Sequence, residues 1–255
     1  MRGFLAALSF LTIFPFGRGK TLEGRDMAAS MAWFPLVGLL LGAIIWLIDI
    51  GLNSILPVAV TSVVLITLLA FFTGGLHLDG LSDTLDGLYF GHSDREKVLS
   101  VMKDSRIGAM GVICLVLLLL MKFVALNNVA PGYRGQALLI MPTLARWSQV
   151  QLAVGARYAR KQGSLAQPFV EFLEWKHFAF ATTCAAAAVF FLTAVSIPGL
   201  ICLGAVSLFA LLSRLYLNKR IGGITGDTIG SVSEINEVMV LLIYSAATSF
   251  VKVVV

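Results

Sequence analysis

A group of acidic residues between positions 73 and 111 has a spacing that suggests metal chemistry. The 255-residue chain carries 14 acidic side chains, and three of them are Asp79, Asp83 and Asp86. On an α-helix, intervals of four and then three residues place all three carboxylates on one face, about one turn apart. Such carboxylates stay ionised together when a cation lies between them or when water reaches the face. Carboxylate oxygens with little histidine or cysteine nearby favour a hard cation, Mg²⁺ before Zn²⁺.

The surroundings of these aspartates favour a functional role over a solvated loop, which is the alternative. The aspartates alternate with leucines and adjoin an apolar segment, where ionisable groups are costly. One or two Mg²⁺ ions bound here could bridge the oxygens of a diphosphate and neutralise charge as a phosphoryl bond breaks.

Three further charged residues follow in the segment 102–108. Lys103 and Arg106 could clamp phosphate oxygens, the arginine as a planar fork and the lysine as a point charge. Asp104 could complete a metal shell or orient Arg106. The alternative is that these basic side chains meet anionic lipid at the start of the next apolar segment.

His77 and Arg146 each allow two interpretations. His77 lies two residues before Asp79 and is either a buried structural residue or a group that binds phosphate or acts as a base, since its pKa lies near neutrality. Arg146 lies within an apolar segment, so it must face the protein interior or a wet cavity. There it pairs either with a carboxylate or with a substrate phosphate.

A second polar centre spans residues 219–237, and its glycines would let backbone amides approach an anion closely. Residues 233–236 are predicted to begin the last helix, whose N-terminus favours negative charge. The alternative is a glycine-rich linker. The residues predicted to contact substrate here are Arg220, Gly226, Asp227 and Glu234, and Asp227, Glu234 and Glu237 could also contact a metal.

The composition predicts an integral membrane protein. Hydrophobic residues make up 58% of the chain and charged residues 13%, with a mean hydropathy of +0.90, whereas soluble proteins carry about 25% charged residues. The three cysteines lie inside apolar runs and indicate packed residues without a disulfide framework. The net charge of +5 is spread over loops, which favours membrane topology over nucleic-acid binding.

The apolar segments predict an all-α, polytopic membrane helical bundle with about seven spans and one short N-terminal apolar helix within residues 3–16. That helix is too short to cross a bilayer, which takes about 20 residues. No repeat or linker divides the chain, so residues 1–255 are predicted to form one membrane-embedded domain. The predicted spans are 28–51, 57–76, 108–126, 136–155, 178–197, 199–217 and 236–253.

The basic residues predict the orientation. The loops 17–27, 77–107, 156–176 and 218–235 fall on one side of the membrane and hold 13 of the 19 Lys and Arg residues. The positive-inside bias places these loops in the cytoplasm. We therefore expect a multi-pass protein of the cell (inner) membrane with its polar chemistry on the cytoplasmic face.

Three motifs resemble those of the cobalamin synthase family, also called adenosylcobinamide-GDP ribazoletransferases. They are GGLHLDGLSDTLDGL (74–88), DREKVLSVMKDSRIGAMGV (94–112) and GGITGDTIGSVSE (222–234). The segments FLTIFPF (10–16) and FPLVGLLLG (34–42) are similar too, so the resemblance covers nearly the whole chain.

The resemblance implies a Mg²⁺-dependent membrane transferase of late cobalamin biosynthesis. Such an enzyme joins adenosylcobinamide-GDP to α-ribazole or α-ribazole 5′-phosphate and releases GMP. The motif carboxylates correspond to Asp79, Asp83, Asp86 and Asp104.

In this hypothesis Mg²⁺ holds the diphosphate, while Lys103 and Arg106, with Arg146 or Arg220, stabilise the developing charge. A ribazole hydroxyl attacks the cobinamide-side phosphorus, and Asp83, Asp86 or His77 takes its proton. The implied partners are these small molecules and membrane lipid, with no nucleic acid, and the oligomeric state, including a homo-oligomer, stays open.

Two other functions remain as alternatives. A CDP-alcohol phosphotransferase-like lipid enzyme has related chemistry, but this chain has Asp79-Gly80-x-x-Asp83 where that family has Asp-Gly-x-x-Ala-Arg. A transporter coupled to divalent cations or protons would also place carboxylates among broken helices. Against it, the acids gather at one edge and no inverted halves are evident.

Overall fold

Helices form most of the described chain, which comprises residues 2–15, 23–92, 94–160, 164–194 and 196–254 of a computed structural model, with side chains described as far as residue 247. Within these residues no strand occurs, and the extended backbone pairs only at an isolated parallel bridge between Tyr158 and Ile224. The prediction of an all-α helical bundle is confirmed.

Five stretches of the described chain are long and apolar enough to cross a membrane. The first runs through the short helix α2 (Gly24–Ser30), one 3₁₀ turn and α3 (Phe34–Leu52). The other four are α7 (Ala109–Asn127), α10 (Trp175–Thr193), α11 (Ile197–Ile221) and α12 (Gly226–Val254). A bent pair of helices would add a sixth, so a multi-pass membrane protein is supported, whereas the predicted number of about seven spans is not confirmed.

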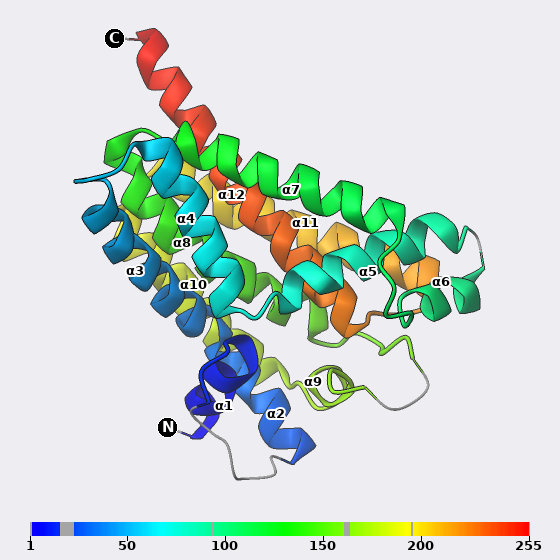
Figure 1. Cartoon of the computed structure of the whole chain (residues 1–255). Helices are drawn as coiled ribbons and strands as arrows, with labels where there is room; N and C mark the ends of the chain where they lie inside the picture. The colour runs from blue at the N-terminus through cyan, green and yellow to red at the C-terminus, as the bar shows by residue number, and fades with distance from the viewer. Residues whose placement is uncertain (1, 16–22, 93, 161–163, 195, 255) are drawn as a thin grey trace.

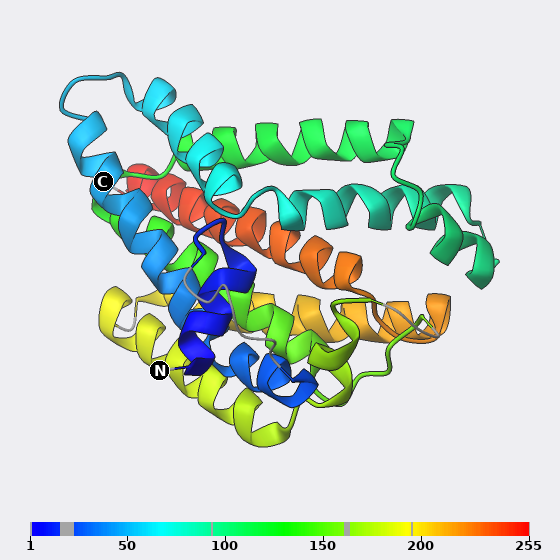
Figure 2. The ribbon, with the colours of Figure 1, turned by 60° about the horizontal axis from the view of Figure 1, so that its bottom comes forward.

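That bent pair consists of α4 (Val58–Phe72) and α5 (Leu76–Phe90), whose axes differ by 87°. Gly74 and Gly75 make the turn in the left-handed region, with φ of 61° and 68°, which glycine adopts without the penalty of a Cβ. The predicted span 57–76 therefore ends in this turn, and Figures 1 and 2 show α5 leaving α4 in a new direction. The acidic segment is thus a separate helix, as the spacing of its aspartates predicted.

The centre of the bundle is α8 (Pro131–Ala153), which packs against α3, α10, α11 and α12 (Figure 1). It is long enough to cross a membrane but is not among the apolar candidates. Its polar side chains include Arg134 and Arg146, and nearly all of its residues from Ala137 onward are buried. Protein therefore surrounds these polar groups, as expected for arginine at membrane depth.

A clamp of hydrogen bonds joins four helices at the end of the bundle away from α6. The Nε of Arg134 donates to the Asp49 carboxylate over 2.9 Å, its Nη1 to the carbonyl of Leu126 over 2.7 Å and its Nη2 to Ser62 Oγ over 3.0 Å. These partners lie on α3, α7 and α4, so one buried arginine holds three neighbours of α8.

The last helix begins at Gly226, ten residues before the predicted span at 236, so the expected start at residues 233–236 is wrong. Thr225 and Thr228 cap the helix reciprocally: the Thr228 N–H donates to Thr225 Oγ1 over 3.3 Å, and the Thr225 N–H donates to Thr228 Oγ1 over 2.9 Å. Most of the predicted glycine-rich centre is therefore the first turns of α12, which runs through the middle of the bundle (Figures 1 and 2).

Short helices cover one end of the bundle. The N-terminal helix α1 (Arg2–Leu11) has ten residues, in agreement with the prediction of a short apolar helix. Its Phe10 packs on Phe169 of α9 (Gln167–Glu171) with ring centroids 4.5 Å apart. Figure 1 shows α1, α2 and α9 together, while α6 (Arg95–Val101) lies beyond the end of α5.

Candidate active site

The site is built on the crossing of α5 and α12, which approach each other closely at two glycines. A Cβ on Gly80 would lie 2.8 Å from the carbonyl oxygen of Asp227, and one on Gly230 would lie 3.1 Å from the Cα of His77. Small residues at such a crossing let helix backbones touch. The crossing joins the two polar centres predicted from the sequence.

Three carboxylates meet at this crossing, and we call Asp79, Asp83 and Asp227 the acidic cluster. Asp79 is exposed and Asp83 is half-buried. The negative charges of Asp79 and Asp227 both act on Asp83, and the positive charge of Arg160 acts in the opposite sense. Asp227 comes from a motif 144 positions after Asp83, so the helix crossing rather than local spacing completes the cluster.

A cavity of about 180 Å³ opens beside the acidic cluster. Asp79, Asp227, His77 and Gln149 line its polar side. Gly226 also lies at its wall, and its predicted contact with substrate stays a prediction. Aromatic rings from Phe10, Phe34 and Phe169 line the other side. Sites for drug-sized ligands usually measure about 300–1,000 Å³, so this cavity accommodates only part of a large substrate.

His77 is buried at the wall of this cavity and is held by Gln149. Its Nε2 lies 2.8 Å from the Gln149 side-chain nitrogen. That nitrogen is a donor, so Nε2 is the acceptor and the ring proton is on Nδ1. Among the described residues the buried Nδ1 of His77 has no hydrogen-bond partner.

Asp86 caps the start of α7. One carboxylate oxygen accepts the N–H of Gly108 over 2.7 Å, and the other accepts the N–H of Gly111 over 2.8 Å. A carboxylate at a helix N-terminus satisfies unpaired amides and interacts favourably with the helix dipole. This capping is a role that the sequence analysis did not assign, and the predicted catalytic and metal roles of Asp86 stay predictions.

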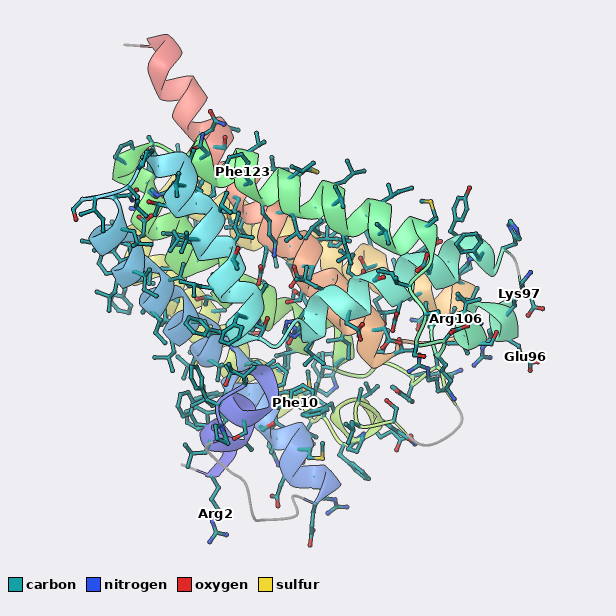
Figure 3. All side chains as sticks on the ribbon, in the orientation of Figure 1. Arg2, Phe10, Glu96, Lys97, Arg106 and Phe123 are labelled. Carbon is teal, nitrogen blue, oxygen red and sulfur yellow. The ribbon has the colours of Figure 1, made fainter. Side chains whose placement is uncertain are left out.

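Lys103, Asp104 and Arg106 lie on the loop between α6 and α7, outside the lining of the cavity. The Arg106 guanidinium donates two hydrogen bonds to Asp104, over 3.0 and 2.7 Å, and these bonds lower the pKa of Asp104 to about 2. Lys103 is exposed, and Arg106 is 87% exposed, near the labelled Glu96 and Lys97 in Figure 3. Their predicted roles in phosphate and metal binding stay predictions.

Asp227, in the second polar centre (residues 219–237), forms an ion pair that was not predicted from the sequence. Asp227 accepts a hydrogen bond from Arg160 Nη2 over 2.5 Å. The sequence signal was weak because Arg160 lies in a basic loop that orientation alone explains. Arg220 donates to the carbonyl of Leu88 over 3.4 Å, and its predicted contact with substrate stays a prediction.

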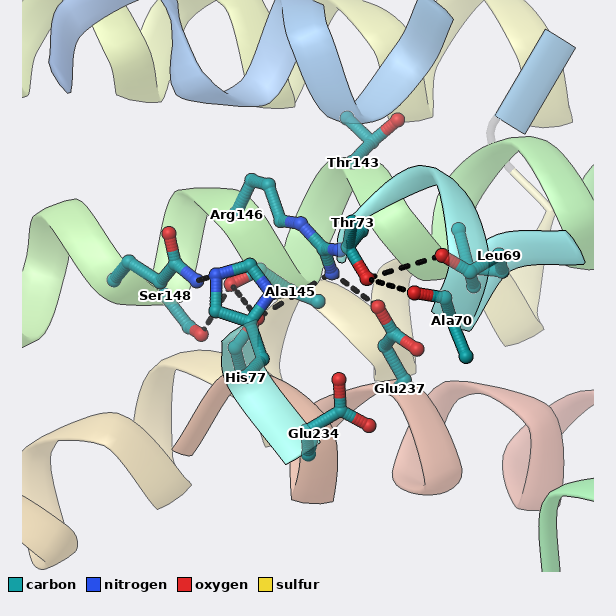
Figure 4. Close-up of polar contacts among 12 residues, drawn as sticks. Leu69, Ala70, Thr73, His77, Thr143, Ala145, Arg146, Ser148, Glu234 and Glu237 are labelled. Atoms are coloured by element: carbon teal, nitrogen blue, oxygen red, sulfur yellow. Dashed lines mark hydrogen bonds and ion pairs between the residues drawn. The ribbon is translucent and has the colours of Figure 1, made fainter. Parts of the chain in front are cut away.

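Arg146 and Glu234 belong to a buried charge network deeper in the bundle (Figure 4). Arg146, with none of its surface exposed, pairs with Glu237. Lys122 of α7 donates to Glu234 over 2.6 Å and to Glu237 over 2.5 Å. Arg146 thus forms the ion pair that was one of its two interpretations, and neither Arg146 nor Glu234 lines the cavity. Their predicted contacts with substrate stay predictions. Lys122 was missed, although a lysine inside an apolar span is itself a signal.

The donor set at the crossing suits Mg²⁺ by its chemistry. Within the described residues no three His, Cys, Asp or Glu side chains are arranged as a ready metal site. Mg²⁺, however, keeps several water ligands and binds through one or two carboxylates together with substrate phosphates. Asp79 and Asp83 with Asp227 provide such carboxylates, so the residues present fit the ion.

Comparison with known proteins identifies the family. Residues 3–245 match the family model described as cobalamin-5-phosphate synthase. A protein of Geotalea daltonii named adenosylcobinamide-GDP ribazoletransferase is 42% identical over 248 residues, which cover 95% of this chain and 96% of the relative. Proteins of the same name from Syntrophobacter fumaroxidans and Desulforamulus reducens are 39% and 38% identical, each over 93% of this chain and over 96% and 93% of the relatives. No solved structure matches the chain significantly. The chain belongs to the cobalamin-5-phosphate synthase family.

Proposed function

We propose that this transferase joins adenosylcobinamide-GDP to α-ribazole or α-ribazole 5′-phosphate, with release of GMP, and that it depends on Mg²⁺. The observation that carries the proposal is the meeting of Asp79, Asp83 and Asp227 beside a cavity, on motifs that are far apart in the chain. Oxygen donors of this kind suit a cation that binds a diphosphate.

The acidic cluster would hold the cation, which supplies positive charge against the non-bridging diphosphate oxygens when bound. The ribazole hydroxyl attacks the cobinamide-side phosphorus, a new P–O bond forms, and the bond to the GMP phosphate breaks. A carboxylate of the cluster accepts the hydroxyl proton. Positioning and electrostatics carry most of the rate, because phosphoryl transfer needs little covalent help from the protein.

From the size of the cavity we infer that the phosphate groups and the corrin ring of the substrate bind at different places. About 180 Å³ accommodates phosphate groups, and His77 is one of the polar residues that line this cavity. The corrin ring is much larger and lies outside the cavity, at the edge of the membrane. The charge bias of the loops supports a reaction on the cytoplasmic face of the cell (inner) membrane.

A turnover assay tests the proposal. Purified protein in proteoliposomes receives adenosylcobinamide-GDP and α-ribazole 5′-phosphate with Mg²⁺ or with EDTA, and GMP and the corrinoid product are measured. We expect equal amounts of the two products with Mg²⁺ and none with EDTA. Parallel assays with α-ribazole and with a CDP-activated lipid identify the preferred substrates.

Asp83→Asn is the informative variant, and Glu96→Gln, an exposed acidic residue on α6, is its matched control. We expect turnover to fall at least 1,000-fold in Asp83→Asn, which corresponds to about 4 kcal/mol of lost transition-state stabilisation, with normal insertion and folding. Near-normal turnover in Asp83→Asn, or full activity in EDTA, would contradict the proposed chemistry.

A further inference from the structure

Arg160 is the cation paired with the acidic cluster in the described part of the chain. Its Nη2 lies 2.5 Å from an Asp227 carboxylate oxygen, and the side chains of Arg160 and Asp227 are only 11% and 21% exposed. A charge-assisted bond at this distance in a sheltered place is strong. In this structure Asp227 is therefore paired with an arginine.

The rest of the Arg160 guanidinium is poorly satisfied. The same Nη2 has a second, long contact of 3.4 Å to the carbonyl of Met102, and Nε is buried without any hydrogen-bond partner. Buried donors in native proteins are usually paired. An unpaired guanidinium N–H beside three carboxylates indicates that a further acceptor belongs here.

Backbone hydrogen bonds position Arg160 beside Asp227. The Ala159 N–H donates to the carbonyl of Ile224, and the Ile224 N–H donates to the carbonyl of Arg157, each over 2.8 Å. These bonds form the parallel bridge that ties the loop after α8 to the residues just before α12. Arg160 therefore follows a fixed segment and is held next to the first turn of the helix that carries Asp227.

Charge counting suggests what the missing acceptor is. When all three carboxylates of the cluster are ionised they carry three negative charges, and Arg160 leaves a net charge of −2, which one divalent cation balances. Once a cation binds Asp227, its pairing with Arg160 weakens and the guanidinium is free to accept another anion. The planar fork of an arginine matches two oxygens of a phosphate group.

We propose that Arg160 is a substrate-binding residue that exchanges Asp227 for the diphosphate of the GDP-activated substrate. Without ligands it neutralises Asp227 and prevents the three carboxylates from repelling one another. With Mg²⁺ and substrate bound, it releases Asp227 to the cation and holds a phosphate oxygen. This inference rests on the proposed function, because it requires a cation and a diphosphate at the cluster.

Cation binding tests this exchange without any turnover. Purified wild-type protein, Arg160→Ala, Arg160→Lys and Arg157→Ala are titrated with Mn²⁺, and free Mn²⁺ is followed by electron paramagnetic resonance. Arg157 is the matched control because it is exposed on the same loop. We expect Arg160→Ala to bind Mn²⁺ about tenfold more tightly, since a competing positive charge is gone, and Arg157→Ala to match the wild type.

Steady-state kinetics supplies the second half of the test. We expect the KM for adenosylcobinamide-GDP to rise at least tenfold in Arg160→Ala, despite the tighter Mn²⁺ binding, and to rise in Arg160→Lys, which keeps the charge but loses the fork. A merely structural role would weaken both properties together. If Arg160→Ala does not fold, a higher KM with wild-type Mn²⁺ affinity in Arg160→Lys supports the same role.

The outcomes distinguish a failure of the role proposed for Arg160 from a failure of the proposed function. Unchanged Mn²⁺ affinity and unchanged KM in Arg160→Ala would overturn the role of Arg160 and leave the proposed function standing. A wild-type protein that binds no Mn²⁺ would overturn the proposed cation site, and the exchange with it.

Discussion

Asp86 and Asp83 lie three residues apart on α5 and have different surroundings. Asp86 is buried and accepts two backbone N–H groups of α7, whereas Asp83 is half-buried at the acidic cluster. We expect Asp86→Ala to lower the free energy of unfolding by about 2 kcal/mol, because it removes a helix cap and leaves two buried amides without an acceptor.

Denaturation of the purified protein in mixed micelles, followed by tryptophan fluorescence, measures this loss. Asp94→Ala is the comparison, since Asp94 caps the short and exposed helix α6 through the N–H groups of Glu96 and Lys97. A smaller loss in Asp86→Ala than in Asp94→Ala would contradict the assignment of Asp86 as a buried cap.

Single residues show what could be read from the sequence and what could not. The spacing of Asp79 and Asp83 correctly predicted a shared helix, because spacing is a local property. Local patterns gave no sign that Arg160 meets Asp227, since that pair forms only when the loop after α8 lies against the start of α12. For Lys122 the signal was present, because a lysine in an apolar span requires a partner.

At the scale of elements, the crossing of α5 and α12 is the contact on which the site depends. In Gly80→Ala the new methyl group would lie 2.8 Å from the Asp227 carbonyl oxygen, so the two helices must separate. We expect a loss of about 1–3 kcal/mol in stability and a fall in turnover, because the two halves of the acidic cluster move apart.

Gly204→Ala is the matched control, since a Cβ at this glycine of α11 would meet nothing within 4 Å. This variant should keep full turnover and gain up to about 1 kcal/mol, as alanine is the better helix former. Equal behaviour of the two alanine variants would show that the crossing tolerates a wider separation.

The buried network joins α7, α8 and α12, and its charges balance as two cations and two carboxylates. Lys122→Met leaves Glu234 and Glu237 with Arg146 alone, and removal of one partner from a buried ion pair costs about 3–5 kcal/mol. Denaturation in mixed micelles measures the change.

A charge-balanced variant distinguishes charge from packing. Lys122→Met combined with Glu234→Gln leaves one cation and one carboxylate, so we expect it to regain part of the lost stability. Lys97→Met, on the exposed face of α6, should change little. If the double variant were less stable than Lys122→Met, charge balance would not be the cause.

The helix boundaries predicted from the sequence were accurate where apolar runs were long. They were wrong where turn-forming or capping residues ended or started a helix. The predicted span 199–217 lies within α11, and the predicted span 108–126 differs from α7 by one residue at each end. The predicted boundaries near 76 and 236 were wrong, because two glycines with positive φ end α4 and a reciprocal threonine cap starts α12 early. Hydropathy detects apolar length and is insensitive to both devices.

For the whole molecule, the polar site and the Arg134 clamp lie at opposite ends of the bundle. Described basic residues such as Arg95 and Arg160 lie at the end that holds the site, so we expect that end to face the cytoplasm. In a cysteine-free background, Ser54→Cys should react with a membrane-impermeant maleimide on intact cells, and Ser105→Cys only after permeabilisation. Both serines are exposed. The reverse labelling pattern would show that the end with the site faces away from the cytoplasm.

The buried network also has a consequence for how the protein is made. Lys122 is separated from Glu234 by 112 residues and Arg146 from Glu237 by 91, so both cations enter the membrane well before their partners are synthesised. Until α12 arrives, α7 and α8 carry uncompensated charges that lipid tolerates poorly. The last helix therefore supplies both carboxylates that compensate these two cations. A chain that ended before α12 would keep both cations in the membrane without these partners.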